Sequence, residues 1–126
     1  MNTQAESTIH KQVCKYLSMK YPKILFQTDL SGIKLSIGAA KKLKILRSGR
    51  AWPDLFLAEP RNGSHGLYIE LKADNVTIIK KDGEMVADKH LQEQFKMLCE
   101  LTKKGYAAHF ACGFDQARHI IDNYLK

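Results

Sequence analysis

The amino-acid sequence predicts an α/β domain in which helices flank a mixed sheet of about four strands. Some segments carry apolar residues at the three- and four-residue spacing of an amphipathic helix, and others are short runs of apolar and aromatic residues typical of strands. Their order is helix, three strands, helix, strand, helix (α-β-β-β-α-β-α). Because no repeat, low-complexity tract or linker interrupts this order, we expect residues 1–126 to form a single domain.

The first helix is expected over residues 3–20, because Pro22 cannot continue it. Its apolar stripe recurs every four residues, at Ile9, Val13 and Leu17. Thr3 and Glu6 have the spacing of a capping box, in which side chains bind the free backbone N–H groups at a helix start. Glu6 is therefore either a capping carboxylate or a member of the site described below.

Three strands are expected next. Residues 24–28 form the first strand, and the turn signal at residues 29–32 follows it. Residues 54–57 and 67–72 form the second and third strands. The turn at residues 59–64 joins them directly, which predicts an antiparallel hairpin.

Two segments between these elements are less regular. Residues 36–47 are ambiguous, although their apolar spacing fits a short helix. Residues 73–89 are largely polar and contain a turn signal at residues 81–83. That segment forms either a small hairpin or a mobile loop.

The last third of the chain predicts a helix, a strand and a final helix. The first of these helices covers residues 89–103 and ends before Gly105. Its apolar stripe consists of Leu91, Phe95, Leu98 and Leu101. Residues 106–112 form the fourth strand, and the final helix follows Gly113.

The charge of the chain points to a polyanionic partner. The formal net charge is +7, and no acidic residue occurs between residues 31 and 53. That stretch contains Lys34, Lys41, Lys42, Lys44, Arg47 and Arg50. Such a local excess is typical of nucleic-acid binding, and the alternative is a solvated basic face without a partner.

Other features of the composition exclude several classes of protein. No apolar run approaches the ~20 residues that cross a bilayer, so we expect no membrane insertion. The N-terminus lacks the basic-then-apolar pattern of a signal peptide. Cys14, Cys99 and Cys112 have neither the number nor the spacing of a disulfide framework or a zinc site. We therefore expect free thiols and a cytoplasmic location.

Charged residues in two of the expected strands indicate a catalytic site. In residues 67–72 the apolar side chains alternate with Tyr68, Glu70 and Lys72, so these three share the other face of the strand. Asp54 begins the neighbouring strand and supplies a second carboxylate. Two carboxylates and a lysine are suited to a hard divalent cation next to a phosphate group. The first hypothesis is a metal-dependent phosphodiesterase, and the alternative is a set of structural ion pairs.

The order of these residues resembles a known family. An acidic residue in a first helix, Pro-Asp, and a strand ending in Glu-x-Lys resemble the PD-(D/E)xK nuclease superfamily. Three segments are more closely similar to its VRR-Nuc (virus-type replication-repair nuclease) family: residues 48–55 (SGRAWPDL), residues 68–72 (YIELK), and Gln94 with Leu98, Leu101 and Gly105. The chain departs from the family at Ala51-Trp52, where a glycine often stands shortly before Pro-Asp, so the local loop conformation is open.

The resemblance implies a restriction-endonuclease-like core and assigns a role to each site residue. Asp54, Glu70 and the backbone carbonyl of Leu71 would bind Mg²⁺, for which Mn²⁺ substitutes. Lys72 would hold the attacking water and stabilise charge on the phosphoryl group. Gln94 would point into the site, unless it is a polar residue at the helix edge. Glu6 would reach the metal directly or through water.

The resemblance also implies the substrate and the partners. Lys41, Lys42, Lys44, Arg47 and Arg50 would contact the phosphates of DNA. Trp52 either packs in the core or stacks on a base, and His90 lies where its helix could approach a phosphate. We expect a homodimeric, Mg²⁺-dependent endonuclease for branched DNA such as Holliday junctions, of phage or bacterial origin. The alternatives are a nuclease for flaps, nicks or single strands, and a non-catalytic DNA-binding module.

Overall fold

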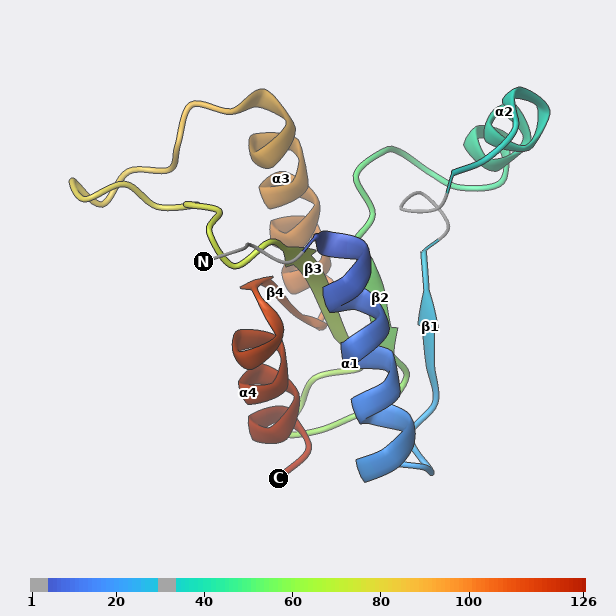
Figure 1. Cartoon of the computed structure of the whole chain (residues 1–126), viewed down its shortest axis with the longest axis vertical. Coiled ribbons are helices and arrows are strands. Elements are labelled where there is room, and N and C mark those ends of the chain that lie inside the picture. The colour runs from blue at the N-terminus through green and yellow to red at the C-terminus, as the bar shows by residue number, and fades with distance from the viewer. Residues whose placement is uncertain (1–4, 30–33) are drawn as a thin grey trace.

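A computed structural model describes residues 5–29 and 34–126 of the protein. In chain order, its elements are α1 (Glu6–Lys20), β1 (Phe26–Thr28), α2 (Ile37–Ile45), β2 (Leu55–Leu57), β3 (Leu67–Lys72), α3 (Lys89–Lys103), β4 (Ala107–Cys112) and α4 (Phe114–Tyr124). The expected α/β order is confirmed, with α2 as an addition, since the ambiguous segment is a helix (Figure 1).

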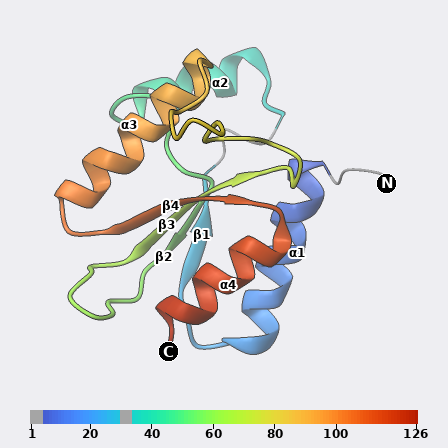
Figure 2. The ribbon, with the colours of Figure 1, turned by 90° about the vertical axis from the view of Figure 1, so that its left-hand side faces the viewer.

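The strands form one mixed sheet in the order β1-β2-β3-β4. β1 pairs with β2 and β2 with β3 in antiparallel fashion, so the expected hairpin is present. β3 and β4 are parallel, and α3 forms the crossover between them. Figure 2 shows α3 above the sheet and α1 with α4 below it.

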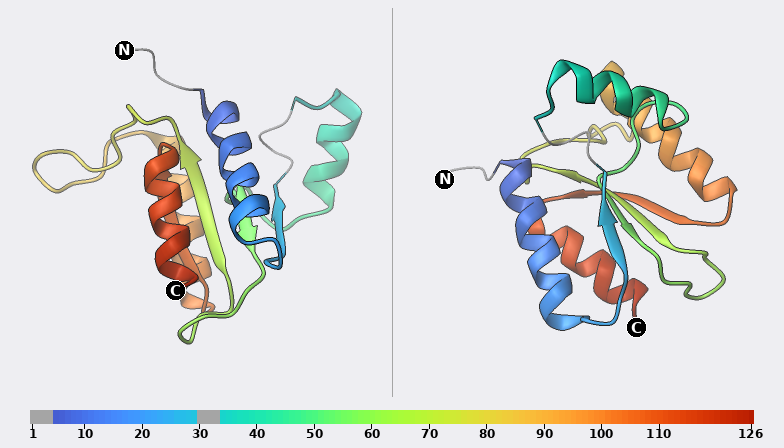
Figure 3. Two further views of the ribbon diagram at one scale, coloured as in Figure 1. Left: turned by 60° about the horizontal axis from the view of Figure 1, so that its bottom comes forward. Right: turned by 90° about the vertical axis from the view of Figure 1, so that its right-hand side faces the viewer.

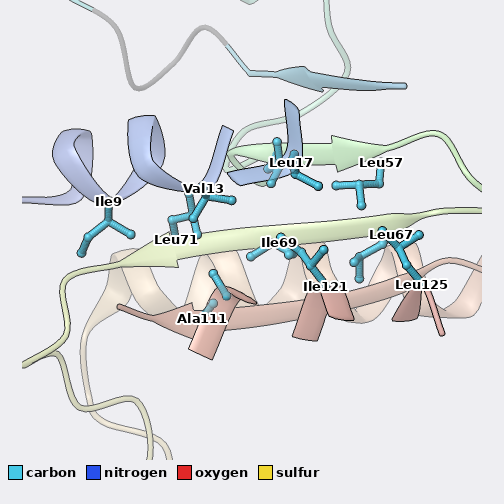
Figure 4. Packing of buried hydrophobic residues seen from close by; sticks show 12 residues of the cluster. Ile9, Val13, Leu17, Leu57, Leu67, Ile69, Leu71, Ala111, Ile121 and Leu125 are labelled. Atoms are coloured by element: carbon cyan, nitrogen blue, oxygen red, sulfur yellow. The ribbon is translucent and has the colours of Figure 1, made fainter. Parts of the chain in front are cut away.

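The hydrophobic core lies between the sheet and the pair of helices α1 and α4. Leu67, Ile69 and Leu71 of β3 are buried on this face, as their alternation predicts. Figure 4 shows the α1 stripe on one side of these β3 residues and Ile121 of α4 on the other side in this view, all within one cluster. Each such side chain contributes ~1.5–3 kcal/mol when it is fully buried. This face therefore holds the buried aliphatic cluster, whereas the side chains of Glu70 and Lys72 alternate to the other face.

The buried stripe of α3 differs from the prediction at one position. Phe95 is 47% exposed, whereas Gln94 is only 6% exposed. The remaining buried members are Leu91, Leu98 and Leu101, as expected. The prediction considered apolar residues only. In the helix, the residue three positions after Leu91, which is Gln94, lies on the buried face, and the residue four positions after it, Phe95, does not.

The two irregular segments differ in character. Residues 73–88 extend away from the body as a small hairpin, closed by the bridge between Ile79 and Met85 (Figures 1 and 3). α2 also projects, and no described helix or strand packs extensively against it. Its exposed apolar residues include Ile37 and Ile45. Of the two alternatives for residues 73–89, the small hairpin is the one that the structure shows.

The start of α1 corrects the capping-box interpretation. The helix begins at Glu6, its N-cap is Ala5, and no side chain caps it. Thr3 lies outside the described residues, as do Ser31 and Gly32 of the expected turn. Glu6 is thus the first residue of the helix and does not occupy the third position that a capping box requires.

Two further expectations concern the whole chain. The three cysteines are free thiols, as predicted. Within the described residues, no helix has the length and apolar character that crossing a membrane requires.

Gly66, at the start of β3, permits a close approach within the hairpin. A methyl group there would lie 2.7 Å from the Phe56 ring and 2.8 Å from the Leu57 carbonyl oxygen. We predict that Gly66→Ala lowers the free energy of unfolding by about 1–3 kcal/mol, because backbone and ring must both shift. Urea denaturation measures this change. The control is Gly38→Ala, in α2, where no atom lies within 4 Å and the stability should not fall; equal losses from both variants would contradict the explanation.

Candidate active site

The register of the hairpin determines where the two carboxylates lie. Leu55 of β2 pairs with Ile69 of β3, so the next pair in the same antiparallel register is Asp54 with Glu70. Neighbouring residues alternate between faces, and both side chains therefore lie on the face opposite the core. Directly paired residues have Cβ atoms ~4.5–5.5 Å apart. Strand pairing thus brings together two acidic residues that are distant in the sequence.

Backbone contacts fix Asp54 in this position. Its Oδ2 atom accepts a hydrogen bond of 2.8 Å from the backbone N–H of Leu71. Its carbonyl oxygen accepts one of 2.8 Å from the N–H of Asp29, which continues the pairing of β1. The N–H and C=O groups of one strand residue point to the same side, so the Leu71 carbonyl is directed toward Asp54 as well.

A pocket of about 280 Å³ surrounds this pair. It is lined by Glu6, Arg47, Ala51, Trp52, Asp54, Glu70, Lys72, His90 and Gln94. These residues come from α1, the segment before β2, β3 and α3. All four side chains expected to be catalytic therefore share one pocket with Glu6.

Three polar residues of the pocket are buried. Glu70, Lys72 and Gln94 are 4%, 6% and 6% exposed, respectively. No ion pair joins Lys72 to Glu70 within the described residues, so the alternative of a structural salt bridge is not realised there. Burial of unpaired charge is costly for folding. Buried ionisable groups of this kind are common at functional sites.

Glu70 carries the clearest electrostatic signature. Burial, followed by the hydrogen bond and the negative charge of Asp54, raises its pKa to about 10, while Lys72 opposes the change. Without a cation, Glu70 is therefore protonated near neutral pH. Two neighbouring carboxylates repel each other when both are ionised, so one of them keeps its proton. A bound cation would compensate the negative charge and release that proton.

Gln94 is incompletely satisfied although it is buried. Its Nε2 atom lies 3.2 Å from Nε2 of His90, one helical turn earlier. Its Oε1 atom is buried and has no partner among the described residues. A buried amide oxygen of this kind can accept a hydrogen bond from a water or a ligand in the pocket. Gln94 is thus not an edge residue of α3, and its free acceptor belongs to the pocket wall.

Glu6 takes no part in a capping box, but it lies in the wall of the pocket. It lines the pocket from the first turn of α1, and its charge adds to the rise in the pKa of Glu70. Across the described ranges, however, no group of three His, Cys, Asp or Glu side chains is arranged to hold a metal ion. The expectation that Glu6 reaches the metal, directly or through water, therefore stays a prediction, and its place in the pocket wall is compatible with both.

The basic residues divide into two groups. Lys44, Arg47 and Arg50 line a second pocket, of about 440 Å³, together with Gly49. Arg47 also lines the carboxylate pocket, so the two cavities adjoin. Lys41 and Lys42 are exposed on α2 and line neither cavity.

Arg47 differs from a free surface cation. Its Nη1 atom donates to both carboxylate oxygens of Asp29, at 2.9 and 3.0 Å. Its Nε atom is buried without a partner. The expected contact with phosphate would therefore use only part of its guanidinium group, and the ion pair with Asp29 also joins the end of α2 to the end of β1.

The sequence left the positions of Trp52 and His90 open, and the structure places both residues in the wall of the carboxylate pocket. Trp52 does not join the core; it lies on the site side of the sheet, and its indole N–H donates to the Ser48 carbonyl at 2.6 Å. His90 lines the pocket through its contact with Gln94. The spacing of four residues between His90 and Gln94 was the available signal for this pairing.

The backbone before Pro53 explains the departure at Ala51. Ala51 has φ 64°, in the left-handed region that favours glycine. Gly49, two residues earlier, also has positive φ. The loop thus keeps a glycine-like conformation although alanine occupies the position, and it stores strain next to the candidate metal ligand.

Comparison with known proteins identifies the fold. No family model and no curated protein matches the chain. A solved structure described as "VRR_NUC domain protein" matches with a TM-score of 0.67 and 19% identity, over 98% of this chain and 90% of that one. The chain has the VRR-Nuc fold. The fold expected from the sequence resemblance is therefore confirmed.

The titration of Glu70 predicts a pH-dependent stability. The folded protein holds this proton more tightly than the unfolded chain does, so the free energy of unfolding without metal should fall as the pH rises from 4.5 to about 10. Glu70→Gln removes the ionisation, and we expect it to stabilise the metal-free protein by roughly 1–3 kcal/mol at pH 8 and to flatten this slope.

Denaturation in EDTA across this pH range tests the prediction. The matched control is Glu93→Gln, the same substitution at an exposed position of α3. An unchanged slope in Glu70→Gln would show that another group causes the pH dependence.

The strain at Ala51 predicts an unusual response to glycine. We expect Ala51→Gly to raise the free energy of unfolding by about 0.5–1 kcal/mol, since glycine adopts positive φ without a Cβ clash. Ala51→Val should lower it by about 1–2 kcal/mol. Chemical denaturation compares them with Ala39→Gly in α2, where glycine removes helix propensity and should not stabilise. A loss of stability in Ala51→Gly would argue against strain.

Proposed function

We propose that the protein is a metal-dependent DNA endonuclease of the VRR-Nuc family, within the PD-(D/E)xK superfamily. The observation that carries the proposal is that Asp54, Glu70 and Lys72 line one pocket, in which Glu70 and Lys72 are buried without an ion pair between them. The described fold and its similarity to a VRR_NUC domain protein support the assignment. The adjoining cationic pocket supplies a surface for a polyanionic substrate.

The pocket fits a hard divalent cation such as Mg²⁺. Asp54 and Glu70 would hold it with the Leu71 carbonyl, and the raised pKa of Glu70 indicates a carboxylate that lacks its compensating charge. The unpaired Oε1 of Gln94 offers an acceptor for a bound water. When present, such an ion polarises the scissile phosphate and lowers the pKa of a bound water. Mn²⁺ prefers the same ligands and should substitute.

The remaining residues have roles that their positions support. Lys72 faces the pocket without an ion pair, so its ammonium group is free to hold the attacking water and to stabilise charge on the phosphoryl oxygens. Gln94, held by His90, orients that water. Glu6, which lines the pocket from the first turn of α1, would reach the ion directly or through a water.

The substrate proposed is DNA with a branched structure. Lys44, Arg47 and Arg50 would contact phosphates near the site, and the exposed Lys41 and Lys42 would contact phosphates farther away along α2. Phosphate contacts position DNA without reading its sequence. A homodimer would present two sites to a symmetric Holliday junction. Flap or nick cleavage by one subunit is the alternative among nucleases.

We predict that Asp54→Asn and Lys72→Ala each reduce cleavage at least ~100-fold, because each removes charge stabilisation from the reaction. The assay uses labelled four-way junctions, flaps and linear duplexes, with Mg²⁺ or EDTA. Matched controls are Asp82→Asn, on the hairpin of residues 73–88, and Lys103→Ala, at the end of α3, both on exposed side chains. They should cleave at the wild-type rate.

Each possible result has a distinct meaning. Cleavage by Asp54→Asn at the wild-type rate would contradict the site assignment. Salt-sensitive DNA binding without cleavage in any metal would favour the non-catalytic module. Sedimentation of the free protein and its junction complex would test the homodimer separately.

A further inference from the structure

A row of side chains crosses the sheet next to the carboxylates, on the same face. Strand register places Gln27 of β1 beside Phe56 of β2, and Phe56 beside Tyr68 of β3. Tyr68 precedes Glu70 by two residues on one strand. The aromatic row therefore lies ~6–7 Å from the carboxylate row.

This row forms the base of a third pocket, of about 220 Å³. Its lining consists of Gln27, Asp29, Arg47, Trp52, Pro53, Phe56 and Tyr68. Trp52 and Arg47 also line the carboxylate pocket, so the two cavities share a wall. Pockets for drug-sized ligands have volumes of ~300–1,000 Å³. This pocket is smaller, and its volume suits a ligand with one planar ring system.

The rings in this pocket are ordered by mutual contacts. Phe56 and Tyr68 stack with centroids 4.4 Å apart and an angle of 27°, and Trp52 lies 6.0 Å from Tyr68 at 54°. The rings of Tyr106 and Tyr68 contact each other edge to face, with their centroids 5.3 Å apart. Phe56, Tyr68 and Trp52 are nevertheless all partly exposed. Aromatic faces held rigidly at the surface are what a stacking ligand requires.

The polar residues at the rim narrow the choice of ligand. Gln27 is exposed on the same face, and its amide can both donate and accept hydrogen bonds at the edge of a ring. Arg47 adds positive charge where the pocket meets the catalytic site. An apolar floor with an amide and a guanidinium at its edge matches a nucleobase attached to a phosphate.

We propose that this aromatic pocket binds an unpaired nucleobase next to the scissile phosphate. The proposal rests on the function proposed above and specifies its substrate: DNA with at least one unstacked nucleotide at the incision point, as at a flap, a bulge or an open branch point. A base paired within a duplex cannot enter, because its faces are covered by its neighbours. The pocket thus selects structure without reading sequence.

The test is a chemical double-mutant cycle. Flap and junction substrates receive an abasic residue at one position at a time around the incision site, and binding to the full chain is measured in Ca²⁺, where cleavage is not required. We expect one position at which the abasic residue weakens wild-type binding roughly ten-fold. Tyr68→Leu should weaken binding of the intact substrate by a similar factor, and the combination should cause no further loss.

Three controls keep the test specific. Tyr68→Phe retains the ring and should restore most of the affinity for the intact substrate that Tyr68→Leu loses. Phe95→Leu removes an exposed ring from α3 that lies outside this pocket and should have no effect. Affinity for linear duplex should be the same in all variants. Thermal unfolding establishes that Tyr68→Leu is folded, and the abasic series with the wild-type protein decides the question if it is not.

The outcomes separate this proposal from the one on which it rests. Equal affinity for every abasic substrate, or losses that multiply in the combination, would overturn the base pocket even when Mg²⁺-dependent cleavage is intact. Absence of cleavage by the wild type would overturn the proposed function, while a positive binding cycle would still support the pocket.

Discussion

The antiparallel pairing of β2 with β3 is the constraint on which the candidate site depends. A shift of one residue in this register would move every side chain of one strand to the opposite face. Asp54 would then no longer oppose Glu70, and the leucines of β2 would leave the core. The same pairing sets the aromatic row of Phe56 and Tyr68 beside the carboxylates. One register therefore determines the core, the carboxylate pair and the aromatic pocket.

The two faces of the sheet have opposite energetic roles. The face toward α1 and α4 buries a continuous aliphatic cluster, which stabilises the register. The other face buries Glu70 and Lys72 without an ion pair, leaves the Gln94 oxygen without a donor, and holds Ala51 at positive φ. Each of these features costs free energy, and all of them adjoin a single pocket. Such a concentration of unfavourable features is typical of a functional site.

The sequence predicted those parts of the fold that depend on periodicity. Alternation in β3 was sufficient to place Glu70 and Lys72 on one face, and this face is the one that the structure shows. A count of apolar residues favoured Phe95 on the buried face of α3, and only the family resemblance pointed to Gln94, which is the residue that the structure buries. The sequence could not decide whether Glu6 belongs to a capping box, since that depends on where α1 begins. The ion pair of Arg47 with Asp29 likewise arises from tertiary structure alone.

Arg47 shows how the separate parts of the site are connected. It lines the cationic, carboxylate and aromatic pockets, and its ion pair with Asp29 fixes it at their junction. α2 otherwise has little contact with the body, so this pair is a principal link between the basic helix and the sheet. In the proposed function, a DNA strand that contacts the basic residues of α2 would reach Asp54 and Glu70 past Arg47. Because Tyr68 lies two residues from Glu70 on the same strand face, a base next to that phosphate would meet an aromatic surface.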